Sequence, residues 1–394
     1  MNKIYKIIWS DVRKCYVVVA EIARNRGKSN VRTIVEGLAA HSLARAGRWA
    51  LPFVTAGILL QPVQGWATNI NAAGGSGTVV NHTDGSSVYN IYAPNQLIEA
   101  GDHKVLRNHF TDFDLSRGNI ANLHFRNESG SLKANNLVNL VDNRINIQGV
   151  VNAVKDNKID GNLFFVSPNG MTVGNTGVIN AGRFVALAPT QSYYDKLTSN
   201  ERDFGNAFKD DLMQFGTRNT EGEHKGELKS TNLEFNSGSA STEGIQIAGQ
   251  INTRSGIVLG AGNIDIKNSA VLQAKSNIAF TDLVNTTTAE GQSVKAFTDA
   301  DSMVLTAVEA EGGDIILRAE TSHAFENSPI VLDSVLEHGL SNVSEYVDSL
   351  ANINSGASVD VAGSIDSDKG VDISASSKTT FTNKSWTGIS GIQD

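Results

Sequence analysis

The stretch that most constrains the fold is 162–188, in which short apolar runs alternate with sharp turns. Residues 163–166 form the first run, and residues 167–170 have the composition of a turn. Proline fixes φ at the second position of such a turn, while asparagine and glycine tolerate left-handed dihedrals. Further short runs follow at 171–173 and 178–179. Short strands between Asn/Gly corners are typical of a chain that winds around a coil, so we interpret this stretch as scaffold and not as an active site.

The same rungs, many of the form Gly-x-Ile, return further along the chain. They occur at 245–251, 256–259, 263–266, 270–272, 314–317, 359–365 and 371–373. Few aromatic residues and many Asn/Gly corners suit a core of stacked Val, Ile, Leu and Ala. Coils of roughly 20–25 residues, stacked about 4.8 Å apart, would then follow one another along a rod. We therefore predict an all-β fold, a right-handed parallel β-helix (solenoid).

Two segments interrupt this repeat. Residues 191–243 are polar and charged, with apolar residues at helical spacing between 204 and 212, and residues 332–350 present an apolar helical face. We predict that both are partly helical excursions, packed on the side of the coil with a structural role. Residues 68–92 alternate in polarity and predict strands that cap the N-terminal end, because an open coil would leave backbone groups unpaired.

The first 67 residues have the features of a leader. Residues 1–28 are basic with interleaved aromatic and β-branched residues, a composition that by itself also fits a membrane-surface segment or a DNA-binding arm. Residues 45–67 then combine a basic flank, an apolar run and small residues, as a secretory signal does. The run is shorter than the about 20 residues of a membrane-spanning helix. Small residues at positions −3 and −1 predict cleavage between Ala67 and Thr68.

The charge of the chain after the leader is strongly negative. Ten of the 33 Lys and Arg residues and three of the 41 Asp and Glu residues lie in 1–67, which leaves 23 basic and 38 acidic residues, a net charge of −15. This balance argues against nucleic acid as the main partner. The single cysteine, Cys15, lies in the leader, so the remaining chain forms no disulfide in an oxidising compartment.

The motif Ser167-Pro168-Asn169-Gly170-Met171 and its continuation VGNTGVINAGRF resemble a known segment of secreted bacterial proteins. That segment, Asn-Pro-Asn-Gly-Ile, belongs to the haemagglutination-activity domain of two-partner-secretion exoproteins, the family of filamentous haemagglutinin and the high-molecular-weight adhesins. Ser167 replaces the first Asn and Met171 replaces the Ile. The second family tetrapeptide, Asn-Pro-Asn-Leu, is missing. Residues 1–28 resemble the extended signal peptide region of very large type V secreted proteins of Gram-negative bacteria.

The resemblance implies a domain plan. Residues 1–67 would be an extended signal peptide, 68–190 the two-partner-secretion domain, 191–243 an insertion outside the coil, and 244–394 a continuation of the β-helix. The domain implies export through the Sec translocon and then through an outer-membrane pore transporter with periplasmic recognition domains. Residues 167–171 would serve as a recognition and turn element.

By the same resemblance the protein is secreted or held at the bacterial surface, where it adheres to a host or bacterial cell-surface receptor. The alternative is a secreted cytolysin or contact-dependent toxin, because such proteins begin with the same domain. Chains with this leader commonly run far longer than 394 residues, so we expect the sequence to be a fragment or a truncated reading frame.

Motifs for catalysis or cofactor binding are missing from the sequence. No two histidines have a metal-ligand spacing, and no nucleophile elbow, phosphate loop or dinucleotide fingerprint occurs. Asp366, Asp368 and Asp372 resemble a calcium loop, but their spacing and the lack of a terminal Glu favour a solvated turn. Paired carboxylates without nearby aromatics make a β-helical polysaccharide-degrading enzyme a weak alternative. We predict no enzymatic activity, cofactor or metal.

Overall fold

The computed structural model describes residues 5–10, 15–20, 68–276, 278, 285–287, 293–295, 312–327 and 356–383. The chain divides into two compact units, Met1–Gln64 and Gly65–Asp394. In the first unit, β1 (Tyr5–Ser10) and β2 (Cys15–Ala20) pair as an antiparallel hairpin. The predicted excursion at 332–350 and the predicted cleavage residue Ala67 lie outside the described residues.

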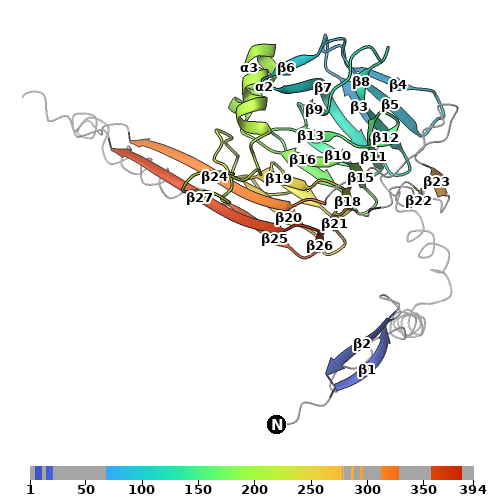
Figure 1. Cartoon of the computed structure of the whole chain (residues 1–394), viewed down its shortest axis with the longest axis vertical. Coiled ribbons are helices and arrows are strands. Elements are labelled where there is room, and N and C mark those ends of the chain that lie inside the picture. The colour runs from blue at the N-terminus through green and yellow to red at the C-terminus, as the bar shows by residue number, and fades with distance from the viewer. Residues whose placement is uncertain are drawn as a thin grey trace, which may run out of the picture. The chain divides into compact units, whose positions relative to one another are not determined.

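In the second unit, parallel strands form three faces, and successive passages of the chain add one strand to each face in turn (Figure 1). Face A consists of β7 (His103–Leu115), β9 (Asn136–Val141), β13 (Asn162–Val166), β16 (Arg183–Leu187), β19 (Ile257–Ala261), β24 (Ile315–Asn327) and β27 (Val371–Asn383). Face B consists of β10 (Ile145–Ile147), β14 (Met171–Val173), β17 (Ile245–Ile247), β20 (Asn263–Ile266) and β25 (Ser358–Val361). Face C consists of β5 (Val88–Ala93), β8 (Ile120–Asn127), β11 (Val150–Lys155), β15 (Val178–Ala181), β18 (Gln250–Thr253), β21 (Val271–Ala274) and β26 (Ser364–Ser367). This mainly β architecture of parallel sheets is consistent with the predicted parallel β-helix.

Equivalent apolar residues of successive passages stack in register. On face A one such column contains Leu106, Leu137, Leu163, Phe184, Ile257 and Ile315, all of them buried. The column advances from position 137 to 163 and then to 184, steps of 26 and 21 residues. Because the inward positions recur at each passage, every new passage buries the apolar surface of the previous one.

A column of asparagines accompanies this apolar core. The Nδ2 groups of Asn122, Asn152 and Asn180 each donate to the Oδ1 of the asparagine one passage earlier, over 3.1, 3.1 and 2.9 Å. Asn252 continues the column by donating to Asn180 over 3.2 Å. Burying a side-chain amide costs free energy unless its donors and acceptors form hydrogen bonds, and stacked asparagines form these bonds with one another. The column therefore ties the passages of face C together.

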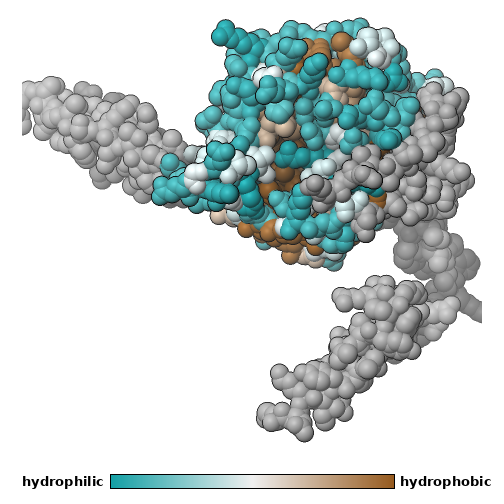
Figure 2. Space-filling model, viewed as in Figure 1, coloured by the Kyte–Doolittle hydropathy of each residue, from teal (hydrophilic) through white to brown (hydrophobic). Residues whose placement is uncertain are grey.

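The two ends of the stack differ. At the N-terminal end, β3 (Asn69–Ala72) and β6 (Ile98–Ala100) pair antiparallel with β7, and β4 (Val79–His82) pairs antiparallel with β5. At the other end Val361, Val371 and Ile373 occupy positions that are buried one passage earlier, yet they are 40–49% exposed. Figure 2 shows hydrophobic atoms gathered there, around β25 and β26, on an otherwise largely hydrophilic surface.

Two short antiparallel pairings and a ribbon complete the described strands. The strand β12 (Lys158–Ile159) pairs with the end of β11, and β22 (Asn285–Thr287) pairs with β23 (Ser293–Lys295). Beyond Ala319, β24 and β27 continue as a two-stranded parallel ribbon past the other strands of face A (Figure 1).

The segment between β16 and β17 covers the outside of face A. It contains α2 (Gln191–Ser199), α3 (Glu201–Ala207) and the π-helix η1 (Phe208–Leu212), and the side chains of Thr190 and Asn200 cap α2 and α3. Its buried residues, among them Phe204, Phe208 and Leu212, pack in one cluster with outward-facing residues of face A such as Phe164. The helices lie beside β6, β7 and β9 in Figure 1. The strands of face A from β9 to β19 are thus buried on both sides.

Candidate functional site

The predicted motif 167–171 is a tight turn that joins β13 on face A to β14 on face B. The amide of Gly170 donates to the carbonyl of Ser167 over 3.1 Å, which closes the turn. The Ser167 hydroxyl donates to the carbonyl of Asn143 over 2.8 Å, and Asn169 Nδ2 donates to the carbonyl of Asp142 over 2.8 Å. The side chains of this turn therefore hold it against the equivalent corner of the preceding passage.

Gly170 has a backbone conformation that favours glycine, with φ of +73°. A Cβ atom at this position would overlap the carbonyl oxygen of Gly244, at the start of the next passage, and lie 2.8 Å from Arg144 Nη1. The backbone here must be close to both neighbouring passages, because Gly170 accepts from the amide of Ile145 and Met171 donates to Gly244. Glycine is required both for its dihedral and for this close approach.

Arg144 is the side chain that joins the turn to its neighbours. Its guanidinium donates to the carbonyls of Asn169 (2.8 Å), Met171 (3.0 Å), Ala240 (2.8 Å) and Gly244 (3.2 Å), and Nε donates to the hydroxyl of Thr172 over 3.0 Å. Burial lowers the pKa of Arg144 to about 10, so the group stays charged at neutral pH. One cation thus links three successive passages and the last part of the insertion.

Most of the motif is inaccessible in the folded chain. Ser167, Pro168, Gly170 and Met171 are buried, and only Asn169 is partly exposed. Once the coil has formed, the side chains of this motif, apart from Asn169, cannot contact a partner. Its role in recognition during export stays a prediction.

Thr68, the first residue after the predicted cleavage point, is fixed to the body of the second unit. Its hydroxyl oxygen accepts from the amide of Ser116 over 3.0 Å and from Asn119 Nδ2 over 2.5 Å. Both partners lie in the turn after β7. The described part of the second unit therefore begins with a residue that already belongs to the fold.

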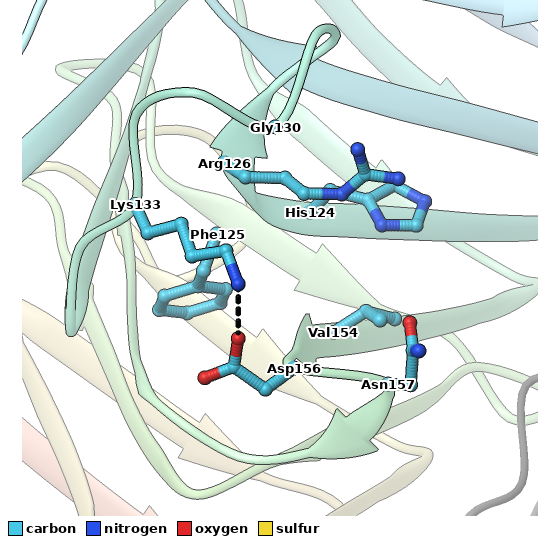
Figure 3. A pocket seen from close by; sticks show the side chains of 8 residues that line it. All are labelled: His124, Phe125, Arg126, Gly130, Lys133, Val154, Asp156 and Asn157. Atoms are coloured by element: carbon cyan, nitrogen blue, oxygen red, sulfur yellow. Dashed lines mark hydrogen bonds and ion pairs between the residues drawn. The ribbon is translucent and has the colours of Figure 1, made fainter.

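A pocket of about 440 Å³ lies at the end of β8, beside the hairpin that joins β11 to β12. Figure 3 shows His124 and Arg126 on one side, the ion pair of Lys133 with Asp156 on another, and Val154 with Asn157 on a third. Lys133 Nζ lies 2.9 Å from Asp156 Oδ1.

On one side of the pocket, the His124 side chain is almost fully buried and stacks on a tyrosine ring. Its ring stacks on Tyr92, with 4.4 Å between the ring centroids, and its Nε2 lies 3.2 Å from Asn90 Oδ1. The guanidinium of Arg126 lies over the Tyr92 ring, 5.0 Å from the centroid. Burial, with a smaller contribution from the Arg126 charge, lowers the pKa of His124 to about 3. The imidazole is therefore neutral at physiological pH.

We expect His124 to make the folded chain sensitive to acid. Its pKa lies near 3 in the folded state and near 6.5 in the unfolded state, so below pH 6.5 the unfolded chain binds a proton that the folded chain excludes. The contribution of the neutral His124 to the free energy of unfolding is fully present above pH 6.5. It decreases as the pH falls from 6.5 towards 3, and about 2 kcal/mol of it is lost at about pH 5. Urea unfolding of residues 68–394 at neutral pH and at about pH 5 measures this loss of unfolding free energy.

The variant His124→Gln should lose less stability between neutral and acidic pH than the parent protein does. His82→Gln, a substitution of an exposed histidine, is the matched control. An acid loss of the same size in His124→Gln and in the parent would contradict this assignment.

The three carboxylates that resemble a calcium loop have separate partners. Asp366 pairs with Lys275, Asp368 accepts from the amide and hydroxyl of Ser276, and Asp372 pairs with Arg218. In the part of the chain that the structure describes, no three His, Cys, Asp or Glu residues are grouped to hold a metal ion.

Arg144 and the pocket are the features that sequence reasoning missed. The available signal for Arg144 was a cation at a polar corner immediately before the apolar rung 145–147. For the pocket it was the Asp-Asn pair at 156–157, whose φ values of 49° and 60° make a tight hairpin turn between two lysines.

Comparison with known protein families supports the first part of the predicted leader. Residues 1–50 match the family of the extended signal peptide of the type V secretion system, a span that contains the predicted extended region 1–28. The match indicates export by the type V pathway. No curated protein matches the chain. Among the residues that the structure describes, no helix is both long enough and apolar enough to span a membrane.

Proposed function

We propose that the chain is a two-partner-secreted exoprotein of the filamentous-haemagglutinin type and that it acts as an adhesin. The Sec translocon takes it across the inner membrane. Residues 68–190 then engage the periplasmic domains of a dedicated outer-membrane pore. The exported chain binds a receptor on host or bacterial cells. The proposal assigns no catalytic step and no cofactor to the protein.

The observation that carries this proposal is the match of residues 1–50 to the type V extended signal peptide. The in-register parallel strands of the second unit support it, because such a stack extends one passage at a time. We take this stack to be a right-handed β-helix that folds outside the cell. Each passage buries apolar surface on the last, so folding opposes backward movement through the pore. Residues 68–190 then act as both secretion signal and folding nucleus.

Export with and without the pore partner tests the proposal. The full chain is produced in a Gram-negative host, and the amount in the medium is compared in the presence and absence of the candidate transporter. We expect partner-dependent appearance of a β-rich chain, as judged by circular dichroism. Equal export without the partner would contradict two-partner secretion, and lysis of target cells would favour the cytolysin alternative over the adhesin.

The variant Asn169→Ala examines the turn in the same assay. It removes the hydrogen bond from Nδ2 to the carbonyl of Asp142, so we expect less export than for the parent chain. Asn175→Ala is the matched control, because Asn175 is an exposed asparagine in the next turn of the same passage. Equal export of the two variants would remove Asn169 from the recognition element.

A further inference from the structure

The pocket at the end of β8 continues into a second hollow. The second hollow has a volume of about 250 Å³ and shares Phe125, Lys133 and Asp156 with the first. The two hollows together are called the groove below. The first is within the usual range for small-molecule sites, about 300–1,000 Å³.

The groove is basic although the chain after residue 67 is acidic. Its charged residues are Lys104, Arg126, Lys133 and Lys155 against Asp102 and Asp156. Lys155 also pairs with Asp160, over 3.1 Å, outside the groove. A local excess of cations on an acidic protein selects for an anionic ligand.

Among the described residues, two cations of the groove, Lys104 and Arg126, form no ion pair with a carboxylate, and Arg126 is the one that lies over an aromatic ring. Nη1 donates to the carbonyl of Glu128 over 3.2 Å, and the guanidinium rests on the Tyr92 ring. Tyr92 is in turn held by its stack on the buried ring of His124. Arg126 as a residue is half-buried, and its guanidinium lies against the ring while it donates to Glu128, so most of its donors stay available. A guanidinium fixed in this way matches a carboxylate with two parallel hydrogen bonds.

Lys133 faces the same pocket, and its present partner is easily exchanged. The side chains of Lys133 and Asp156 are 60% and 56% exposed. An exposed ion pair of this kind contributes little to stability, so a ligand anion can take the place of Asp156. The neutral His124 adds no competing charge.

We propose that the groove binds a small ligand that presents a carboxylate, with the Arg126 guanidinium donating to that carboxylate and the charge of Lys133, on another side of the pocket, attracting it. Calorimetric titration of residues 68–394 with sodium glucuronate tests this, with glucose as the uncharged match and N-acetylaspartate N-methylamide as a peptide-type carboxylate. We expect glucuronate or the aspartate derivative to bind, more weakly at higher salt, and glucose not to bind. The acid that binds with the higher affinity shows whether the carboxylate of the natural ligand belongs to a sugar or to a peptide. No binding of either acid overturns the proposal.

Variants place the ligand in the groove. Arg126→Gln should lower the affinity about tenfold or more, and Arg126→Lys should lower it less, because it keeps the charge but loses the planar fork. Lys133→Gln should also weaken binding. Lys225→Gln removes one exposed positive charge elsewhere and should bind as the parent does. Circular dichroism and thermal melting check that each variant folds. Unchanged affinity in folded Arg126→Gln protein would overturn the assignment.

Discussion

Replacing Gly170 by valine is expected to destabilise residues 68–394 by about 3 kcal/mol or more. Two costs combine. A β-branched residue at φ of +73° is strained by roughly 1–3 kcal/mol, and the new side chain must push Gly244 and Arg144 apart, at roughly 1–3 kcal/mol for overpacking. Urea unfolding followed by circular dichroism measures the change.

A matched glycine separates the two costs. Gly85 has φ of +82°, but nothing lies within 4 Å of a Cβ atom built there. Gly85→Val should therefore show the backbone strain alone, about 1–3 kcal/mol. A loss in Gly170→Val no larger than that in Gly85→Val would mean that the close approach to Gly244 is not a constraint in solution.

Replacing Phe208 by alanine is expected to lower the free energy of unfolding by about 3–5 kcal/mol, the usual cost of deleting a buried aromatic side chain. Phe208 is fully buried, and its ring lies 5.4 Å from that of Phe164 and 6.1 Å from that of Phe204, centroid to centroid. The cavity left by the missing ring would lie between the insertion and the outer side of face A. Chemical denaturation of residues 68–394 provides the measurement.

The control for Phe208→Ala is Ile373→Ala in β27, the last described strand of face A. Ile373 is 48% exposed, so its truncation leaves no closed cavity and should cost less than half as much. Equal losses for the two variants would contradict the packing of the insertion on face A.

The packing of the insertion on face A also bears on the domain plan. A domain boundary at residue 190 divides a hydrophobic cluster that contains Val105, Phe164 and Phe208.

The sequence alone determined where the chain turns and which short apolar runs form strands. Short rungs between Asn/Gly corners predicted the parallel strands, because side-chain alternation and turn chemistry are local properties. The turn at 167–170 follows from the same rules. The extended signal peptide could be recognised by its resemblance to that of type V secreted proteins, whereas the secretory signal at 45–67, which rests on composition, stays a prediction. The apolar spacing that predicted a helix likewise lies in α3 and η1.

Only the tertiary structure decided the features that depend on contacts between residues far apart in the sequence. Arg144 binds carbonyls 96 and 100 residues later, so no local pattern reports its role. The depressed pKa of His124 requires the burial that the fold supplies, and Arg126 is held by Tyr92, a residue of another strand. The groove exists because the hairpin at 155–158 lies beside the loop before β9. A sequence specifies such sites only through the stack as a whole, since each passage must first pair with the previous one before its side chains meet.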